Sequence, residues 1–229
     1  MKEFIYLSLR GETASFKVPQ VYQGFLLSLP VPPYSSILGI LSKICSREIT
    51  PKDGRIGFRY SFQGVGKDLE TYHRWERKKS GKYGYTGTAV RSREIHYKPH
   101  LELILDNTDL LPELQNPVQT PTLGRSQDIA SIDELRIVQG EPIPEAVIAD
   151  TLVRLEDLGD AIIPGMLYNL PEVFDYTKEM VRLPLNITRY LALTDNTISI
   201  SAPNLYRVNR VDDHKDNTDD QIFYLYKWT

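Results

Sequence analysis

Residues 29–45 read Leu29-Pro-Val-Pro-Pro-Tyr-Ser-Ser-Ile-Leu-Gly-Ile-Leu-Ser-Lys-Ile-Cys45 and contain the strongest helix signal in the chain. Three prolines precede two serines, and serine is favoured at a helix N-cap. We therefore expect a helix that begins at a cap formed by Ser35 or Ser36 and buries one apolar face. The apolar residues recur at helical spacing: Ile37, Leu38, Leu41, Ile44 and Cys45.

Working outward from this helix, the flanking segments have the pattern of β-strands. Residues 3–10 are rich in β-forming side chains, and residues 56–62 alternate between apolar and polar positions. The remaining expected elements are a strand at 95–105, a helix at 108–114 and a strand at 135–138. This order, βαββαβ, is that of the ferredoxin-like fold and of the RNA-recognition module. The sequence thus predicts an α+β protein with a ferredoxin-like (RRM-like) core over residues 1–140.

The stretch 64–93 interrupts this order and is strongly basic. It holds eight basic and three acidic residues, a net charge of +5, so the rest of the chain carries −8 of the total of −3. Glycines lie among tyrosines at 81–87, which favours a projecting hairpin or a mobile loop over a packed element. Such segregation can create an anion-binding surface on an acidic protein, whereas a solvated basic loop is the alternative.

A domain boundary is expected at Gly140-Glu-Pro-Ile-Pro144. Beyond it, residues 141–229 are predicted to form a smaller β-rich region with strands at 189–193, 198–200 and 223–228. Residues 146–158 fit either a strand or a helix. An acidic loop is expected at 212–220.

Composition places the chain among ordinary globular proteins, since 41% of its 229 residues are hydrophobic and 25% are charged. Its apolar runs are shorter than a membrane span, and its first residues lack the apolar stretch of a signal peptide. A single cysteine, Cys45, excludes an internal disulfide and zinc-finger spacing. We expect a cytoplasmic protein with no membrane partner and no cofactor.

Four motifs, in order, resemble the Cas-five family of CRISPR-associated proteins, within the RAMP superfamily. They are Ala14-Ser-Phe-Lys-Val-Pro19, the 29–41 proline-serine helix start, Arg93-Glu-Ile95 before Pro99, and Leu123-Gly-Arg-Ser-Gln-Asp128. The resemblance implies a subunit of a type I (I-B-like) Cascade surveillance complex, with a long thumb hairpin inserted in a ferredoxin-like core. It also implies as partners the 5′ handle of the guide RNA (crRNA), a backbone subunit, a large subunit and, through the complex, target DNA.

Several residues of the predicted core are candidate RNA contacts. Ser35 and Ser36 lie where helix N–H groups could meet a phosphate. The alternatives are an ordinary serine-capped helix and a Gly39 that only permits helix packing. Arg125 and Ser126 could reach phosphate oxygens, or Arg125 could pair with Asp128 and pin the loop. The core candidates are Arg10, Lys17, Ser35, Ser36, Arg93, Arg125 and Ser126.

In the hairpin, cations alternate with aromatic rings, the combination that holds single-stranded RNA. Trp75 is the ring we single out, although it could instead be the hydrophobic anchor at the root of the hairpin. The hairpin candidates are Arg74, Trp75, Arg77, Lys78, Lys79 and Lys82.

Catalytic motifs are weak. The histidines are His73, His96, His100 and His214, and His96 with His100 could form a two-histidine metal pair, although no acidic residue stands at ligand spacing. The chain has no Walker loop and no GxSxG motif. The leading hypothesis is a non-catalytic RNA-binding subunit without a metal site. Its rivals are a precursor-crRNA endoribonuclease that uses His73 with Tyr72 and Lys78, and an α/β interaction module that binds another anion.

Overall fold

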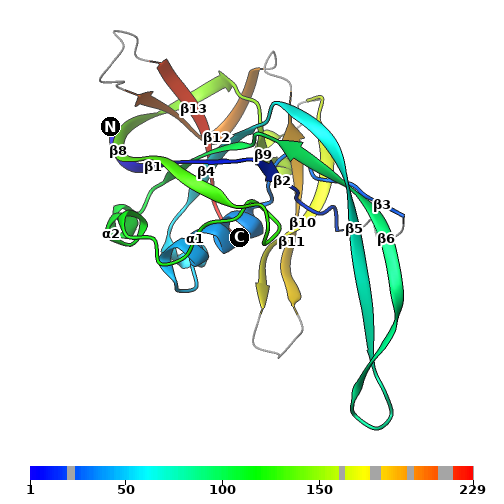
Figure 1. Ribbon diagram of the computed structural model, residues 1–229. Coiled ribbons are helices and arrows are strands. Elements are labelled where there is room, and N and C mark those ends of the chain that lie inside the picture. Colours follow the sequence, from blue (N-terminus) through cyan, green and yellow to red (C-terminus); the bar gives the residue numbers. More distant parts are fainter. Residues whose placement is uncertain (20–23, 160–162, 176–181, 195–198, 211–218, 229) are drawn as a thin grey trace.

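The computed structural model describes residues 1–19, 24–159, 163–175, 182–194, 199–210 and 219–228. A closed barrel of antiparallel strands, ordered β1-β7-β4-β13-β12-β8, forms the main body (Figure 1). Its strands are β1 (Lys2–Gly11), β4 (Ile56–Ser61), β7 (His100–Leu105), β8 (Ala130–Val147), β12 (Ser199–Arg210) and β13 (Asp219–Tyr226).

The two faces of the barrel wall carry separate apolar clusters, because successive side chains of a strand point to opposite faces. The smaller cluster takes residues from five barrel strands and fills the interior: Phe4, Tyr6, Ile104, Val138, Val208, Phe223 and Leu225. Gly57 allows this packing, since a Cβ there would lie 2.9 Å from Ile104 Cγ1 and 2.9 Å from the Tyr224 carbonyl oxygen. The outer face, with Ile5, Leu7 and Leu9 of β1, packs in the main core together with the apolar side of α1.

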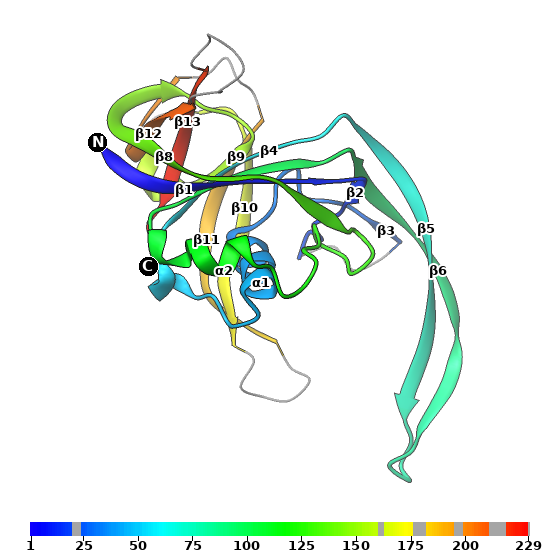
Figure 2. The same cartoon turned by 60° about the vertical axis from the view of Figure 1, so that its left-hand side comes forward.

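Helix α1 (Tyr34–Cys45) and helix α2 (Leu111–Gln115) lie on the same side of the barrel (Figure 2). Short 3-10 helices precede β4 and α2, at η1 (Pro51–Asp53) and η2 (Thr108–Leu110). The elements β1, α1, β4, β7, α2 and β8 follow one another in the predicted order. Their four strands are arranged β8-β1-β7-β4, with every neighbouring pair antiparallel. Most of the chain is nevertheless β-structure, because β12 and β13 extend this sheet until it closes.

The predicted serine cap of α1 is wrong. The helix begins at Tyr34, its N-cap is Pro33, and no side chain caps it. The amides of Ser36 and Ile37 donate to the Pro33 carbonyl oxygen at 2.9 and 3.2 Å. The start is earlier than expected because Tyr34 is itself a core residue: its ring stacks on Tyr226 at 4.3 Å and its hydroxyl donates to the Leu152 carbonyl at 3.0 Å. Ser35 and Ser36 therefore lie within the first turn.

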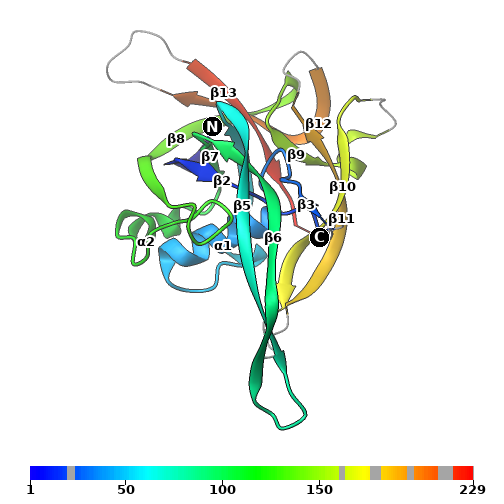
Figure 3. The same cartoon turned by 45° about the vertical axis from the view of Figure 1, so that its right-hand side comes forward.

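The basic stretch forms a long antiparallel hairpin of β5 (Gly64–Arg77) and β6 (Tyr83–Tyr97), paired from Gly64↔Tyr97 to Arg77↔Tyr83. Its root is attached to the body by β2 (Thr13–Ala14) and β3 (Phe25–Leu26), which both pair with β6. The distal half projects away from the barrel in every view (Figures 1, 2 and 3).

A second sheet, ordered β10-β11-β9, covers another side of the main core. Its strands are β9 (Thr151–Arg154), β10 (Met166–Asp175) and β11 (Leu183–Leu193), and η3 (Leu155–Leu158) follows β9. The ambiguous segment 146–158 thus contains the end of β8, strand β9 and a 3-10 helix. The expected boundary at 140 falls inside β8, and β12 and β13 pair with β8 and β4 of the predicted core. The expected acidic loop lies largely outside the described residues.

Tyr34 provides a stability test. Tyr34→Ala should lower the free energy of unfolding by about 3–5 kcal/mol, because it removes a fully buried ring and leaves a cavity. Tyr34→Phe should cost only about 1 kcal/mol, since it removes one hydrogen bond. Urea unfolding measures both, with Tyr83→Ala as the control because that ring is 62% exposed. Equal urea midpoints for Tyr34→Ala and Tyr83→Ala would contradict this account of the core.

Candidate nucleic-acid interface

The hairpin tip gathers cations that the protein itself does not neutralise. The turn is closed by the Lys78 amide donating to the Lys82 carbonyl at 2.8 Å, and Gly81 adopts a φ of 78° that suits glycine. Within the described part of the chain no ion pair engages the exposed cations of the distal hairpin, Arg74, Arg77, Lys78, Lys79 and Lys82. Several like charges at the end of a projecting arm create a local positive field, although the whole chain is acidic.

Aromatic rings lie beside these cations on one face of the hairpin. Cross-strand partners share a face, and Trp75 is opposite Tyr85, with ring centroids 5.7 Å apart in an edge-to-face arrangement. Trp75 is 61% exposed, Tyr85 53% and Tyr83 62%. Trp75 therefore lies in the distal, solvent-facing part of the hairpin, and the alternative that it anchors the root is wrong.

Arg125 and Arg93, two predicted RNA contacts, lie in an ion-pair network at the base of the hairpin. The Arg125 guanidinium contacts Asp128 at 2.8 Å, Glu70 at 2.7 Å and Asp68 at 3.0 Å. Arg93 is 9% exposed and pairs with Glu70 at 2.7 Å. The interpretation in which Arg125 pairs with Asp128 and pins its loop matches this geometry.

The central carboxylate of this network is ionised at neutral pH. Burial raises the pKa of Glu70, but hydrogen bonds from Tyr72, Arg125 and Arg93 outweigh burial and lower this pKa to about 2. The network thus contains two guanidinium groups and three carboxylates, and most of its charge is compensated internally.

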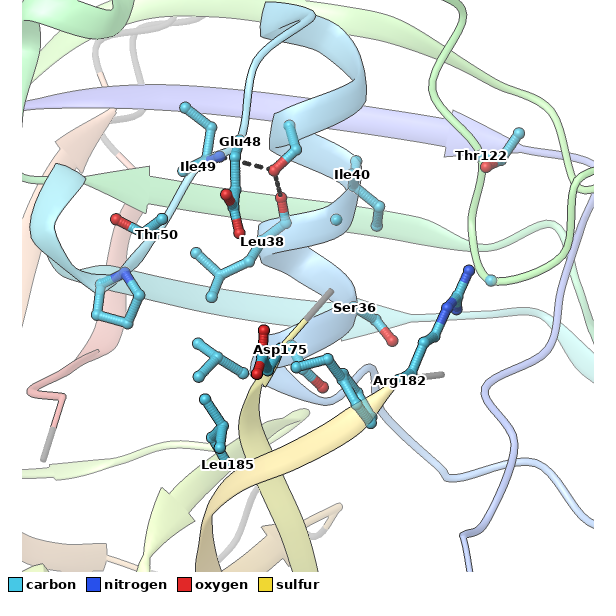
Figure 4. Close-up of a pocket in the computed structure, with 17 residues that line it drawn as sticks. Ser36, Leu38, Ile40, Glu48, Ile49, Thr50, Thr122, Asp175, Arg182 and Leu185 are labelled. Atoms are coloured by element: carbon cyan, nitrogen blue, oxygen red, sulfur yellow. Dashed lines mark hydrogen bonds between the residues drawn. The ribbon is translucent and has the colours of Figure 1, made fainter. Parts of the chain in front are cut away.

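A groove of about 960 Å³ lies between α1 and the ends of β10 and β11 (Figure 4). Ser35, Ser36 and Gly39 of α1 line one wall, and Arg182 and Leu185 line the other. Apart from its chain neighbours and the backbone of α1, no heavy atom of the described residues comes within 4 Å of the position that a Gly39 Cβ would occupy. Gly39 therefore faces open space, and the alternative that it permits close helix packing is wrong.

The other candidates do not converge on one point. Arg10 pairs with Asp133 at 2.7 Å on the exposed end of β1, while Lys17 and Ser126 are exposed on separate loops. The predicted residues therefore divide into the hairpin tip, the hairpin base, the groove and isolated surface positions. Arg182, Asp175 and Thr122 also line the groove, and no sequence motif links these residues to α1.

The histidines do not form the metal pair considered from the sequence. His96 is 1% exposed, stacks on Phe62 at 4.0 Å and shares a 2.8 Å hydrogen bond with the Tyr60 hydroxyl. His100 Nε2 is instead 2.8 Å from Ser8 Oγ. Burial lowers the pKa of His96 to about 4, so this ring is neutral at pH 7. His214 lies outside the described residues.

Among the described residues, no three or more His, Cys, Asp or Glu side chains are grouped as a metal site would require. Nor does any helix in the same residues have the length and apolarity needed to span a bilayer.

A family model described as CRISPR-associated protein (Cas_Cas5) matches residues 4–179. No curated protein matches the sequence. Among solved structures, a chain of a "CRISPR RNA-guided surveillance complex" is similar, with a TM-score of 0.57, 16% identity, and coverage of 87% of this chain and 91% of the other.

A chain of the Type III-B Cmr-beta complex bound to cognate target RNA and AMPPnP is also similar. Its TM-score is 0.55 at 11% identity, and the match covers 86% of each chain. At these identities the structural matches establish the fold only.

The exposed hairpin cations can be tested by salt dependence. Replacing Arg77, Lys78, Lys79 and Lys82 together by Ala should weaken binding of single-stranded RNA. It should also reduce the slope of log affinity against log salt by roughly 0.7 per lost phosphate contact. The melting temperature should hold, because these side chains form no ion pair with any described residue. Unchanged affinity with an unchanged slope would show that the tip is only a solvated loop.

Burial of His96 should make the free energy of unfolding depend on pH in the acid range. Its folded pKa of about 4 lies below the ordinary value of about 6.5, so between these values the unfolded chain binds a proton that the folded chain does not. The unfolding free energy should be constant above pH 6.5 and should fall by up to about 3 kcal/mol as the pH drops to 4. In His96→Gln this contribution is absent, so the stability difference between parent and variant should shrink on acidification. Urea titrations at several pH values measure it, and a constant difference would contradict the assignment.

Proposed function

Because the chain belongs to the Cas-five family of CRISPR-associated proteins, we propose that it is a non-catalytic subunit of a CRISPR RNA-guided antiviral surveillance complex. In that complex it binds the 5′ handle of the guide RNA and assists assembly. The expected type I, I-B-like subtype is part of this proposal.

The observation that carries the proposal is the distal hairpin. It combines cations that form no ion pair with the described residues and exposed rings, on an arm that extends away from the body. Cations bind phosphates and ring faces accept bases, which suits single-stranded RNA without requiring a particular sequence. In this role the hairpin is the thumb that the family resemblance implies.

The groove beside α1 is the proposed second contact. Its wall offers the hydroxyls of Ser35 and Ser36, the uncovered backbone at Gly39 and the cation of Arg182. A sugar-phosphate backbone can approach closely where no Cβ intervenes, and hydroxyls can donate to its oxygens. Lys17 and Ser126 are further candidates, as exposed donors on the same body.

The four strands β8-β1-β7-β4, with α1 and α2, are interpreted as a ferredoxin-like core whose sheet β12 and β13 complete. The expected division at residue 140 would then separate the core sequence from a C-terminal part that closes its barrel. The proposed partners are the crRNA handle, a backbone subunit reached by the hairpin and a large subunit, with target DNA bound through the complex.

The rival function, cleavage of precursor crRNA, requires an acid and a base at the same scissile bond. The candidate residues do not lie together. His73 is on the face of the hairpin that carries Tyr85, at a ring distance of 6.2 Å. Tyr72, its neighbour in the strand, points to the opposite face and contacts Glu70 and Arg93. This separation supports a binding role.

Incubation with repeat-containing RNA in the absence of metal tests the two functions. The parent protein should leave this RNA intact while it binds a handle-containing oligonucleotide. His73→Ala should behave like the parent in both assays. A discrete cut near the base of the repeat hairpin, abolished by His73→Ala, would replace the binding proposal with the nuclease.

A further inference from the structure

The ion-pair network at the hairpin base lies where the arm leaves the body. Asp68 and Glu70 belong to β5, and Arg93 belongs to β6. Arg125 comes from the loop before β8, and one of its nitrogens contacts both hairpin carboxylates, Glu70 at 2.7 Å and Asp68 at 3.0 Å. Oε1 of Glu70 also accepts from Arg93 Nε at 2.7 Å. Both arginines therefore meet on one carboxylate of the hairpin.

The loop that carries Arg125 is fixed to the body. Asp128 has a fully buried side chain and accepts from Thr13 Oγ1 of β2 at 2.6 Å as well as from Arg125. Gly124 has a φ of +102°, and a Cβ there would lie 2.1 Å from the Ser15 carbonyl oxygen. Only glycine allows this approach. The guanidinium is thus held on one side by the body and contacts the hairpin on the other.

A small rotation at the base of a long hairpin produces a large displacement of its tip. Glu70 is seven residues from Arg77, which corresponds to about 23 Å at roughly 3.3 Å per residue. Over that length a rotation of about 10° at the base would move the tip by about 4 Å, comparable to the strand spacing in a sheet. A two-stranded hairpin is not held rigid by its own contacts alone. Its direction therefore depends on the attachment at its root.

We propose that Arg125 is a positioning residue, which fixes the direction of the β5–β6 hairpin relative to the barrel by joining Asp128 of the body to Glu70 and Asp68 of the hairpin. Arg125 acts on RNA through the hairpin and not as a phosphate ligand. Arg93 supports it by holding Glu70 in place. A guanidinium suits this role because its planar fork contacts several carboxylates at once, which an ammonium cannot reproduce.

A distance measurement tests the proposal without RNA. Spin labels are placed at Ser80→Cys in the tip and Gln115→Cys at the end of α2, in a Cys45→Ser background. Pulsed electron paramagnetic resonance should give a single narrow distance distribution for this parent. Arg125→Gln and Glu70→Gln should each broaden or shift it, and Arg125→Lys should lie between these variants and the parent. Arg74→Gln is the matched control, because Arg74 is an exposed hairpin arginine that forms no ion pair within the described residues.

If Arg125→Gln fails to fold, Asp68→Asn provides a milder variant, since Asp68 is the most exposed partner, at 41%. Asp68→Asn should broaden the distribution without a large change in melting temperature. Distributions identical to the parent in all folded network variants would overturn the proposal.

The expected effect on RNA affinity rests on the proposed function. Its direction distinguishes a positioning role from a direct contact with RNA. Removing an acidic charge near a direct RNA site strengthens binding, whereas removing a positioning contact weakens it. Glu70→Gln and Arg125→Gln should therefore both weaken binding of a repeat-derived RNA oligonucleotide severalfold. The double variant should be no weaker than the worse single variant, because both changes break one unit.

A direct phosphate contact predicts a different result, in which Arg125→Gln lowers the salt slope by roughly 0.7 and Glu70→Gln does not weaken binding. That result would overturn the positioning role. Absence of RNA binding by the parent protein would instead contradict the proposed function. The distance measurement would still decide the role of Arg125.

Discussion

The structure depends on the buried contact between Tyr34 of α1 and Tyr226 of β13, whose rings stack at 4.3 Å. The Tyr226 hydroxyl accepts from Tyr190 of β11 at 2.8 Å and donates to Glu172 of β10. One ring thus joins the strand that closes the barrel to the helix on its outer face and to the second sheet. The two walls of the groove belong to that helix and that sheet, so their spacing follows from this contact.

Charged side chains have different surroundings at the base and at the tip of the hairpin. At the base, arginines and carboxylates are mostly shielded from water and compensate one another, so that removing one partner leaves an uncompensated buried charge. At the tip, lysines and arginines face solvent, and no ion pair with another described residue engages them. Partnered charges hold geometry, and unpartnered charges remain available to a ligand. Sequence composition alone counts both kinds together, which is why the net charge of −3 says little about this surface.

Predictions from the sequence succeeded where a local period or local composition carries the information. The helix at α1 follows from its apolar spacing, and an insertion at 64–93 follows from glycines and basic residues between alternating strands. In the structure the hairpin extends to Tyr97, so residues 95–97 belong to β6 and not to the next strand of the core. The observed N-cap of α1, Pro33, lies two or three residues before the expected one, because the burial of Tyr34, a long-range effect, competes with the local preference of serine for the N-cap. Trp75 was ambiguous because a tryptophan in a strand can face either solvent or core.

The sequence by itself determined the order of β1, α1, β4, β7, α2 and β8 and the concentration of cations in the hairpin, since each depends on neighbours along the chain. Only the tertiary structure decided that β12 and β13 close the barrel, that α1 and β10–β11 enclose a groove, and that Arg125 meets Glu70 and Asp68. The physical reason is the separation of the partners: Arg125 and its hairpin carboxylates are 55 and 57 residues apart. No local pattern records such a contact, because it depends on how the strands are arranged in space.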